Sequence, residues 1–188
     1  LQATTRAESR VVEPSEEWTD DKENMDYVEQ TDTGYHRDYQ DNPGYQWLHG
    51  GEAQGVLRGG CITSLMNLRG TEYWPDMEDS ILVLETPEGA DYWEGEDLAK
   101  IQSCLTNLRL DGTFDEANGV VFGRGFGYDD DEREELKAMV EEATASHSMP
   151  VLYGADIGHT DPVTTVPLGS QASICSEKNE FIVGSGVK

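Results

Sequence analysis

Two separated residues, Glu85 and His159, carry the clearest sign of chemistry in this 188-residue chain. Glu85 ends the apolar run Ile81–Leu84, and His159 lies in the segment Gly158–Pro162 far downstream. A carboxylate that orients a histidine makes up two thirds of a hydrolytic triad. The third member, a nucleophile, has no comparable signal. We therefore expect this chain to be only part of an enzyme.

Two residues could supply a nucleophile from within the chain. No G-x-S-x-G pattern is present, and Ser185 lies in a Gly-Ser-Gly sequence near the C-terminus that predicts a turn. Cys61 follows Gly59-Gly60 and could serve a cysteine hydrolase with His159. A small apolar residue after a Gly-Gly turn is the simpler interpretation of Cys61.

The remaining cysteines and histidines show no metal-site spacing. The three cysteines form no CxxC pair, and no histidine has the i+4 or His-x-His company that suits zinc. Cys104 lies on the apolar stripe of a predicted helix, and we expect it to be in the core. We expect the other histidines to be surface or turn residues (His36, His49 and His147). The sequence therefore predicts no metal.

The elements that must position Glu85 and His159 follow an α/β pattern from residue 81 onward. Apolar runs predict three buried strands and helical periodicity predicts two helices between them, in the order Ile81–Glu85, Glu94–Arg109, Val120–Phe122, Asp129–Ser146 and Val151–Tyr153. Such a βαβαβ unit forms a parallel sheet with right-handed crossovers. The carboxyl ends of parallel strands share one edge, so both candidate residues should face that edge. On spacing alone, a helix-capping Glu85 and a turn histidine remain alternatives.

The segments around this unit have weaker signals. Gly123–Gly127 lacks the G-x-G-x-x-G and Walker patterns and is followed by aspartates, which favours a tight strand-to-helix turn over a phosphate loop. Short strands are expected near Thr164–Val166, Ala172–Cys175 and Phe181–Val183.

Residues 1–43 are expected to form a polar, acidic arm or interdomain segment, and residues 44–188 to form the folded domain. The first 50 residues are too aromatic for a disordered linker, with Trp18, Tyr27, Tyr35, Tyr39, Tyr45 and Trp47. They should pack on something, such as a neighbouring domain. The chain begins at Leu1 without an initiator methionine, which favours a fragment or a processed product.

The charge of the chain is extreme, with 38 acidic and 13 basic residues and a net charge of −25. This charge disfavours nucleic acid and anionic membranes as partners. The acid is spread along the chain and lysine is scarce, so adaptation to high salt is favoured over an acidic binding face for a cationic partner. No apolar run of 18 residues and no signal peptide is visible, and the cytoplasm is the expected compartment.

Taken together, an ordered set of motifs resembles the C-terminal domain of the serine peptidase family of LD-carboxypeptidases and microcin C self-immunity peptidases. The resemblance covers roughly residues 44–183 and is carried by Gly55–Cys61, Gly70–Asp76, Ile81–Glu85, Leu105–Phe114, Val120–Gly123 and Val151–Gly169. It implies a compact, β-rich α/β domain of the swivelling type.

The resemblance also implies roles. Glu85 and His159 match the glutamate and histidine of a Ser–His–Glu triad, whose serine lies in an N-terminal flavodoxin-like domain that this chain lacks. That domain would be the partner, no metal or cofactor would be needed, and the protein could form a homodimer. The main alternative from another class is a non-catalytic acidic binding module.

Within the family, the Thr-Asp-Pro after His159 and the Gly-Gly-Cys motif look more like the microcin C immunity branch. That branch cleaves the amide between an aminoacyl group and a nucleotide-like moiety, whereas the peptidoglycan branch removes a terminal D-amino acid from an L,D-linked peptide. Trp18 or Trp47 could stack on such a substrate. Packing against the absent domain is the alternative for both tryptophans.

We predict that the folding stability of this chain rises with salt. A net charge of −25 repels itself, and salt shortens the screening length from about 10 Å at 0.1 M to about 3 Å at 1 M. Thermal melting in low salt and in molar potassium chloride measures the effect. An unchanged or lower midpoint in high salt would instead favour an acidic face for a cationic partner.

Overall fold

The centre of the fold is a set of four parallel strands, β5 to β8, that lie side by side in chain order. The computed structural model describes residues 8–21, 37–91 and 93–185. In that part of the chain the strands of the main sheet are β1 (Arg10–Val11), β4 (Gln46–His49), β5 (Glu52–Cys61), β6 (Ser80–Glu85), β7 (Gly119–Gly123), β8 (Val151–Ala155), β9 (Gln171–Cys175) and β10 (Glu180–Val183). A separate two-stranded sheet pairs β2 (Glu17–Trp18) with β3 (Gln40–Asp41).

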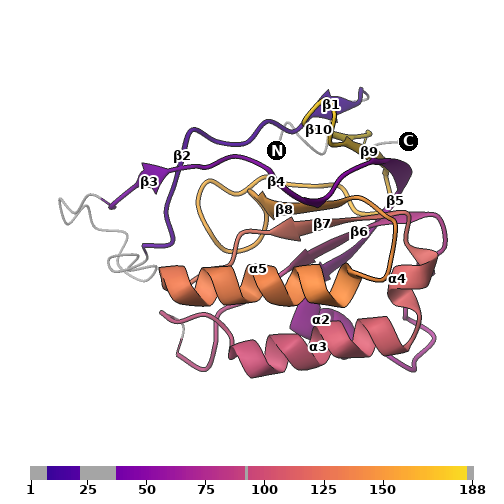
Figure 1. The fold of residues 1–188 in the computed structure, drawn as a ribbon, viewed down its shortest axis with the longest axis horizontal. Coiled ribbons are helices and arrows are strands. Elements are labelled where there is room, and N and C mark those ends of the chain that lie inside the picture. The colour runs from indigo at the N-terminus through magenta and orange to yellow at the C-terminus, as the bar shows by residue number, and fades with distance from the viewer. Residues whose placement is uncertain (1–7, 22–36, 92, 186–188) are drawn as a thin grey trace.

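The helices cover one face of this sheet (Figure 1). They are α2 (Ile62–Met66), α3 (Leu98–Leu110), α4 (Thr113–Glu116) and α5 (Asp130–Thr144). Each lies between two consecutive parallel strands. Right-handed crossovers that always step in the same direction place every crossover helix on the same face. Beyond β5 the sheet curls over, so that its antiparallel strands β9, β10 and β1 cover the other face (Figure 1).

Strand β6 shows how the two faces form two cores. Leu82 and Leu84 pack in the cluster that the helices cover, whereas Ile81 and Val83 pack in the cluster beneath β9 and β10. Successive side chains of a strand point to opposite faces, so a strand covered on both sides must be apolar throughout. This requirement explains the continuous apolar run at residues 81–84.

The predicted βαβαβ unit is confirmed, with small shifts at the helix starts. Helix α3 begins at Leu98 and not at Glu94, because Asp97 is its N-cap and accepts a hydrogen bond from Ala99 N. Asp129 caps α5 and forms a capping box with Glu132. These two carboxylates accept hydrogen bonds from the N–H groups of Asp129 and Glu132, just after the Gly123–Gly127 turn.

Two expectations about local structure were wrong. Gly59 and Gly60 do not form a turn, because both lie inside the ten-residue strand β5. Thr164–Val166 is not a strand: Pro162 and Pro167 flank this segment, and proline lacks the N–H group that a strand ladder needs.

The first 50 residues also contribute to the sheet. β1 pairs with β10, and β4 extends the opposite edge by pairing with β8. The Tyr45 hydroxyl donates a hydrogen bond to Val12 O in the core on the β9–β10 side. Tyr27, Tyr35 and His36 lie outside the described residues. Among the helices of the described ranges, none is long and apolar enough to cross a membrane.

The close approach of β5 to β6 requires glycine at position 59. Gly59 has a φ of +112°, and a Cβ atom there would lie 2.1 Å from Val83 O. Gly60 has a similar φ of +134°, but a Cβ atom there would meet nothing within 4 Å. A larger residue would therefore meet both backbone strain and steric overlap at position 59, but only backbone strain at position 60.

We predict that Gly59→Ala lowers the free energy of unfolding by more than about 4 kcal/mol, because strain and overlap act together. Gly60→Ala, the matched control, should cost only the strain, about 1–3 kcal/mol. Chemical denaturation of both variants measures the difference. Equal losses would show that β5 can move away from β6 at little cost.

Candidate active site

Glu85 and His159 meet at the carboxyl edge of the parallel strands. Glu85 is the last residue of β6, and His159 lies in the loop after β8. His159 Nδ1 lies 2.7 Å from Glu85 Oε2. The Glu85 side chain is 12% exposed and that of His159 is 30% exposed. The predicted position of both residues at this edge is confirmed, and the two side chains are in contact. Their catalytic role stays a prediction.

Two glycines let the loop approach Glu85. Gly158 has a φ of +103°, and a Cβ atom there would lie 2.8 Å from Glu85 Oε2. A Cβ atom on Gly123, at the end of β7, would lie 3.0 Å from Glu85 Cβ. Any larger residue at these positions would push the carboxylate or the loop aside. Of these two glycines, only Gly158 has a sequence signal, because it directly precedes His159.

Sequence reasoning missed a second carboxylate at the histidine. Glu88 Oε2 lies 2.9 Å from His159 Nε2, within ion-pair distance. This oxygen is buried and makes no hydrogen bond of good geometry. Both ring nitrogens of His159 therefore face carboxylates. The only signal in the sequence is that Glu88 follows Glu85 by three residues.

A buried ion pair anchors the loop that carries His159. Asp156, the first residue after β8, lies 2.7 Å from Arg124 Nη2, and both side chains are less than 10% exposed. Burial lowers the pKa of the Arg124 guanidinium, and the Asp156 carboxylate opposes this by favouring the charged form. Asp156 also accepts a hydrogen bond from Ser15 N at 2.6 Å.

The described part of the predicted arm touches the same loop. Thr19 and Asp161 exchange two backbone hydrogen bonds of 2.8 Å, and Arg37 forms an ion pair with Asp161. Together with Ser15, these residues hold the loop on both sides of His159. The division of the chain at residue 43 stays a prediction.

The two tryptophans proposed as substrate contacts lie in different surroundings. Trp18 is buried, with the Arg124 and Arg133 guanidinium carbons 4.6 and 4.9 Å from the centre of its ring. Trp47 lies on β4, is partly buried against the core, and donates a 2.8 Å hydrogen bond to Asn179 Oδ1. Substrate stacking by either ring stays a prediction.

The alternative nucleophile Cys61 lies opposite Glu85 in the β5–β6 ladder. Its sulfur lies 3.4 Å from Thr63 Oγ1. Among the described residues, Cys61 makes no hydrogen bond to His159. Burial raises the pKa of the Cys104 thiol, and Cys104 lies in the core as expected.

The other described histidines lie apart from Glu85. His147 follows α5 and lies 3.0 Å from Asp115 Oδ1. His49 is the last residue of β4, an edge strand, and is partly exposed. No group of three or more His, Cys, Asp or Glu side chains in the described ranges could hold a metal ion.

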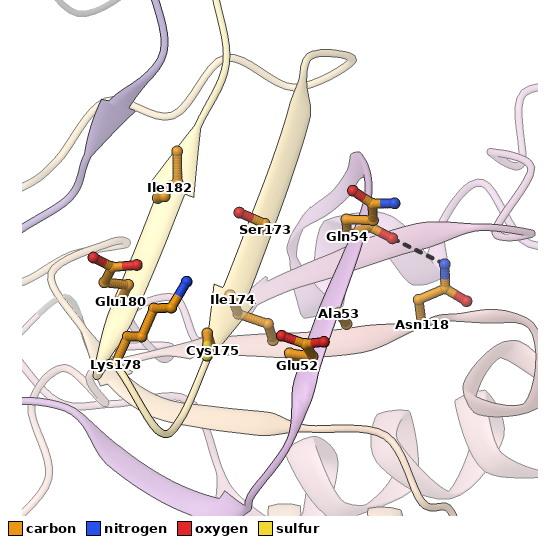
Figure 2. A pocket seen from close by; sticks show the side chains of 10 residues that line it. All are labelled: Glu52, Ala53, Gln54, Asn118, Ser173, Ile174, Cys175, Lys178, Glu180 and Ile182. Carbon is orange, nitrogen blue, oxygen red and sulfur yellow. Dashed lines mark hydrogen bonds between the residues drawn. The ribbon is translucent and has the colours of Figure 1, made fainter.

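A hollow of about 570 Å³ lies at the other end of the sheet (Figure 2). Its walls are the first residues of β5 together with β9 and β10, including Glu52, Ser173, Cys175, Lys178 and Glu180. β5 is ten residues long, about 30 Å, and its far end reaches Glu85. The hollow is therefore not part of the Glu85–His159 site.

Comparison with known proteins assigns the family. The profile of the LD-carboxypeptidase C-terminal domain matches residues 54–174, which is more than half of the chain. The chain belongs to this family. This match confirms the family that the sequence motifs predicted.

Relatives and solved structures agree with this assignment. The Bacillus subtilis protein named "Putative carboxypeptidase YocD" is 29% identical over 163 residues, 87% of this chain and 46% of its own length. The microcin C7 self-immunity protein MccF of Escherichia coli is 26% identical over 126 residues, 66% of this chain and 35% of its own. An MccF-like protein from Bacillus anthracis str. Ames has a TM-score of 0.76 at 30% identity, over 95% of this chain and 52% of that chain. The structure of MccF with glutamyl sulfamoyl guanosine has a TM-score of 0.79 at 20% identity, over 96% and 51%.

The predicted fold class is confirmed by these structures. The LD-carboxypeptidase C-terminal domain described here spans about half the length, or less, of the proteins that it matches.

We predict that Asp156→Asn destabilises the domain by about 3–5 kcal/mol, because it leaves the buried Arg124 charge unpaired. Asp130→Asn is the matched control: Asp130 also pairs with an arginine, at 3.0 Å, but its side chain is 99% exposed. Urea denaturation measures the free energy of unfolding of both variants, and the control should lose less than about 1 kcal/mol. Similar small losses in both variants would mean that the Arg124–Asp156 pair does not anchor the loop.

Proposed function

We propose that this domain supplies Glu85 and His159 to a Ser–His–Glu triad. The whole protein would then be a serine hydrolase that cleaves amide bonds in L,D-peptides or aminoacyl-nucleotide conjugates. The observation that carries the proposal is the 2.7 Å contact between Glu85 Oε2 and His159 Nδ1. Membership of the LD-carboxypeptidase C-terminal domain family supports it.

The chemistry follows from the atoms in contact. Glu85 accepts a hydrogen bond from Nδ1–H and thereby fixes the tautomer in which Nε2 carries the lone pair. Nε2 takes the proton from the attacking serine and later returns it to the leaving amine. Glu85 stays ionised and stabilises the imidazolium that forms between these two steps. This mechanism uses neither a metal nor a cofactor.

The serine and the donors of the oxyanion hole would come from an N-terminal domain of the same protein. The length comparison supports this partner, because this chain covers about half of each solved relative. That domain would dock at the carboxyl edge of β6 and β8, where Glu85 and His159 lie. The Thr19–Asp161 contact, which ties the arm to the His159 loop, would lie close to that junction.

The substrate classes follow from the family and its relatives. One relative is named a murein peptide carboxypeptidase, and another is a microcin immunity protein whose structures hold aspartyl sulfamoyl adenosine or glutamyl sulfamoyl guanosine. Both kinds of substrate contain an amide that a serine triad can cleave. We propose the aminoacyl-nucleotide class as the first to test, because of the Gly-Gly-Cys and His-Thr-Asp-Pro motifs.

We predict that the full-length protein cleaves such an amide and that Glu85→Gln lowers kcat by about 10⁴-fold with little change in KM. The change leaves the shape of the site intact but favours the wrong histidine tautomer. His159→Ala should lower kcat at least as much. His147→Ala, a histidine outside the site, is the control and should keep full activity. Steady-state kinetics of these variants would reject the triad if Glu85→Gln retained most of its kcat.

We also predict that the isolated 188-residue domain does not turn over either substrate class. Turnover by the purified domain that is lost in Cys61→Ala would contradict the serine mechanism and promote the cysteine alternative. Cys61→Ala in the full-length protein should keep catalysis within a few-fold.

A further inference from the structure

The contact between Glu88 and His159 places a negative charge where a triad receives its nucleophile. Glu88 Oε2 lies 2.9 Å from Nε2, the nitrogen that must accept the serine proton. A carboxylate is only an acceptor, so this contact is attractive only while Nε2 carries a proton. During catalysis Nε2 must be unprotonated and must face the serine. Glu88 then loses this partner.

The backbone holds Glu88 close to His159. Glu88 and Gly95 form an isolated β-bridge, and Gly89 N donates a 2.9 Å hydrogen bond to Glu94 O. Gly95 N in turn donates a 3.0 Å hydrogen bond to Gly127 O. Residues 87–91 and 93–96 therefore form the two arms of a hairpin that is tied to the β7–α5 loop. The Glu88 side chain can change its rotamer, but its charge stays at the site.

The surroundings of Glu88 are rich in carboxylates. The side chain is 40% exposed, although Oε2 itself is buried. A hollow of about 650 Å³ beside the same hairpin is lined by six carboxylates, those of Asp91, Glu94, Glu96, Asp97, Asp129 and Glu132. Lys100 lies near them and is paired with Glu96. Such a surface lowers the potential at the site and attracts cations.

The scissile bond must lie close to Glu88. A serine reaches Nε2 at about 3 Å, and its oxygen attacks a carbonyl carbon at about 3–3.5 Å. A carboxylate oxygen 2.9 Å from Nε2 therefore lies within about 9 Å of the scissile bond. At this range a carboxylate attracts an ammonium group of the substrate and repels a second carboxylate.

We propose that Glu88 is a specificity-determining residue that binds an ammonium group on the acyl part of the substrate. When the serine takes Nε2, the ammonium group replaces His159 as the partner of Glu88. Substrates with a cationic acyl part, such as a lysyl group, are then preferred over those with an acidic one. This inference rests on the triad proposed above and names the substrate class for that site.

The test compares three sulfamoyl adenosine conjugates in the full-length protein. Lysyl and norleucyl groups have similar size and differ in the side-chain ammonium, whereas a glutamyl group adds a carboxylate. A fourth conjugate, Nα-acetyl-lysyl, removes the α-ammonium. We expect kcat/KM for the lysyl conjugate to exceed that of the glutamyl conjugate by about 100-fold. Relative to the lysyl conjugate, kcat/KM should fall at least about tenfold for either the norleucyl conjugate, which lacks the side-chain ammonium, or the Nα-acetyl-lysyl conjugate, which lacks the α-ammonium.

Variants at Glu88 then connect the preference to this side chain. Glu88→Gln should reduce the preference for the cationic conjugate to less than about threefold, and Glu88→Lys should reverse it in favour of the glutamyl conjugate. Glu94→Gln, which removes an exposed carboxylate from the same hairpin, should change the preference by less than about twofold. Circular dichroism checks that each variant is folded.

Three results would overturn the inference while the triad stands. The first is equal kcat/KM for all four conjugates in the wild-type protein. The second is a cationic preference that persists in Glu88→Gln. The third is a loss of turnover in Glu88→Gln that is the same for every conjugate, which would make Glu88 a positioning residue for His159. If His159→Ala keeps full activity on these conjugates, the triad itself fails.

Discussion

The hydrogen bond between Glu85 and His159 is the interaction on which the rest of the structure depends. It joins the end of β6 to the loop after β8, two positions that are 74 residues apart in the chain. The parallel strands β6 and β8, on either side of β7, both end at this edge and so bring the two residues together. Gly123 and Gly158 then remove the Cβ atoms that would keep the carboxylate and the imidazole apart. The position of the Glu85–His159 site therefore follows directly from the topology of the sheet and from these two glycines.

The loop of His159 is held by charge as well as by backbone contacts. The domain has a net charge of −25, yet one of its arginines, Arg124, is buried beneath the ring of Trp18 and pairs with Asp156 three residues before His159. A buried pair of this kind contributes little net stability when intact, but its disruption is costly. Glu88 has a related dependence: its carboxylate lies within ion-pair distance of the His159 imidazole, which the proposed mechanism pairs with a serine instead.

Much of the parallel unit could be predicted because its strands and helices have strong periodic signals. The run Ile81–Leu84 and the stripes on α3 and α5 are examples. Strand β5 was missed because Gly55, Gly59 and Gly60 interrupt its apolar pattern. Gly55 and Gly59 serve the close approach to β6, and none of the three forms a turn. Glu85 and His159 could be predicted from strand ends, whereas Glu88 could not. Its position at Nε2 depends on the hairpin formed by residues 87–91 and 93–96, which hydrogen bonds between the two arms and to Gly127 define.

The central claim is that His159 activates a serine supplied by another domain. Labelling of the full-length protein with a fluorophosphonate probe, followed by mass spectrometry of the labelled peptide, tests it most directly, because this probe reacts only with an activated nucleophile. The account predicts a label on a single serine outside the 188 residues described here, and its loss in His159→Ala. A label on Ser185 or Cys61, or labelling that is unchanged in His159→Ala, would contradict the account.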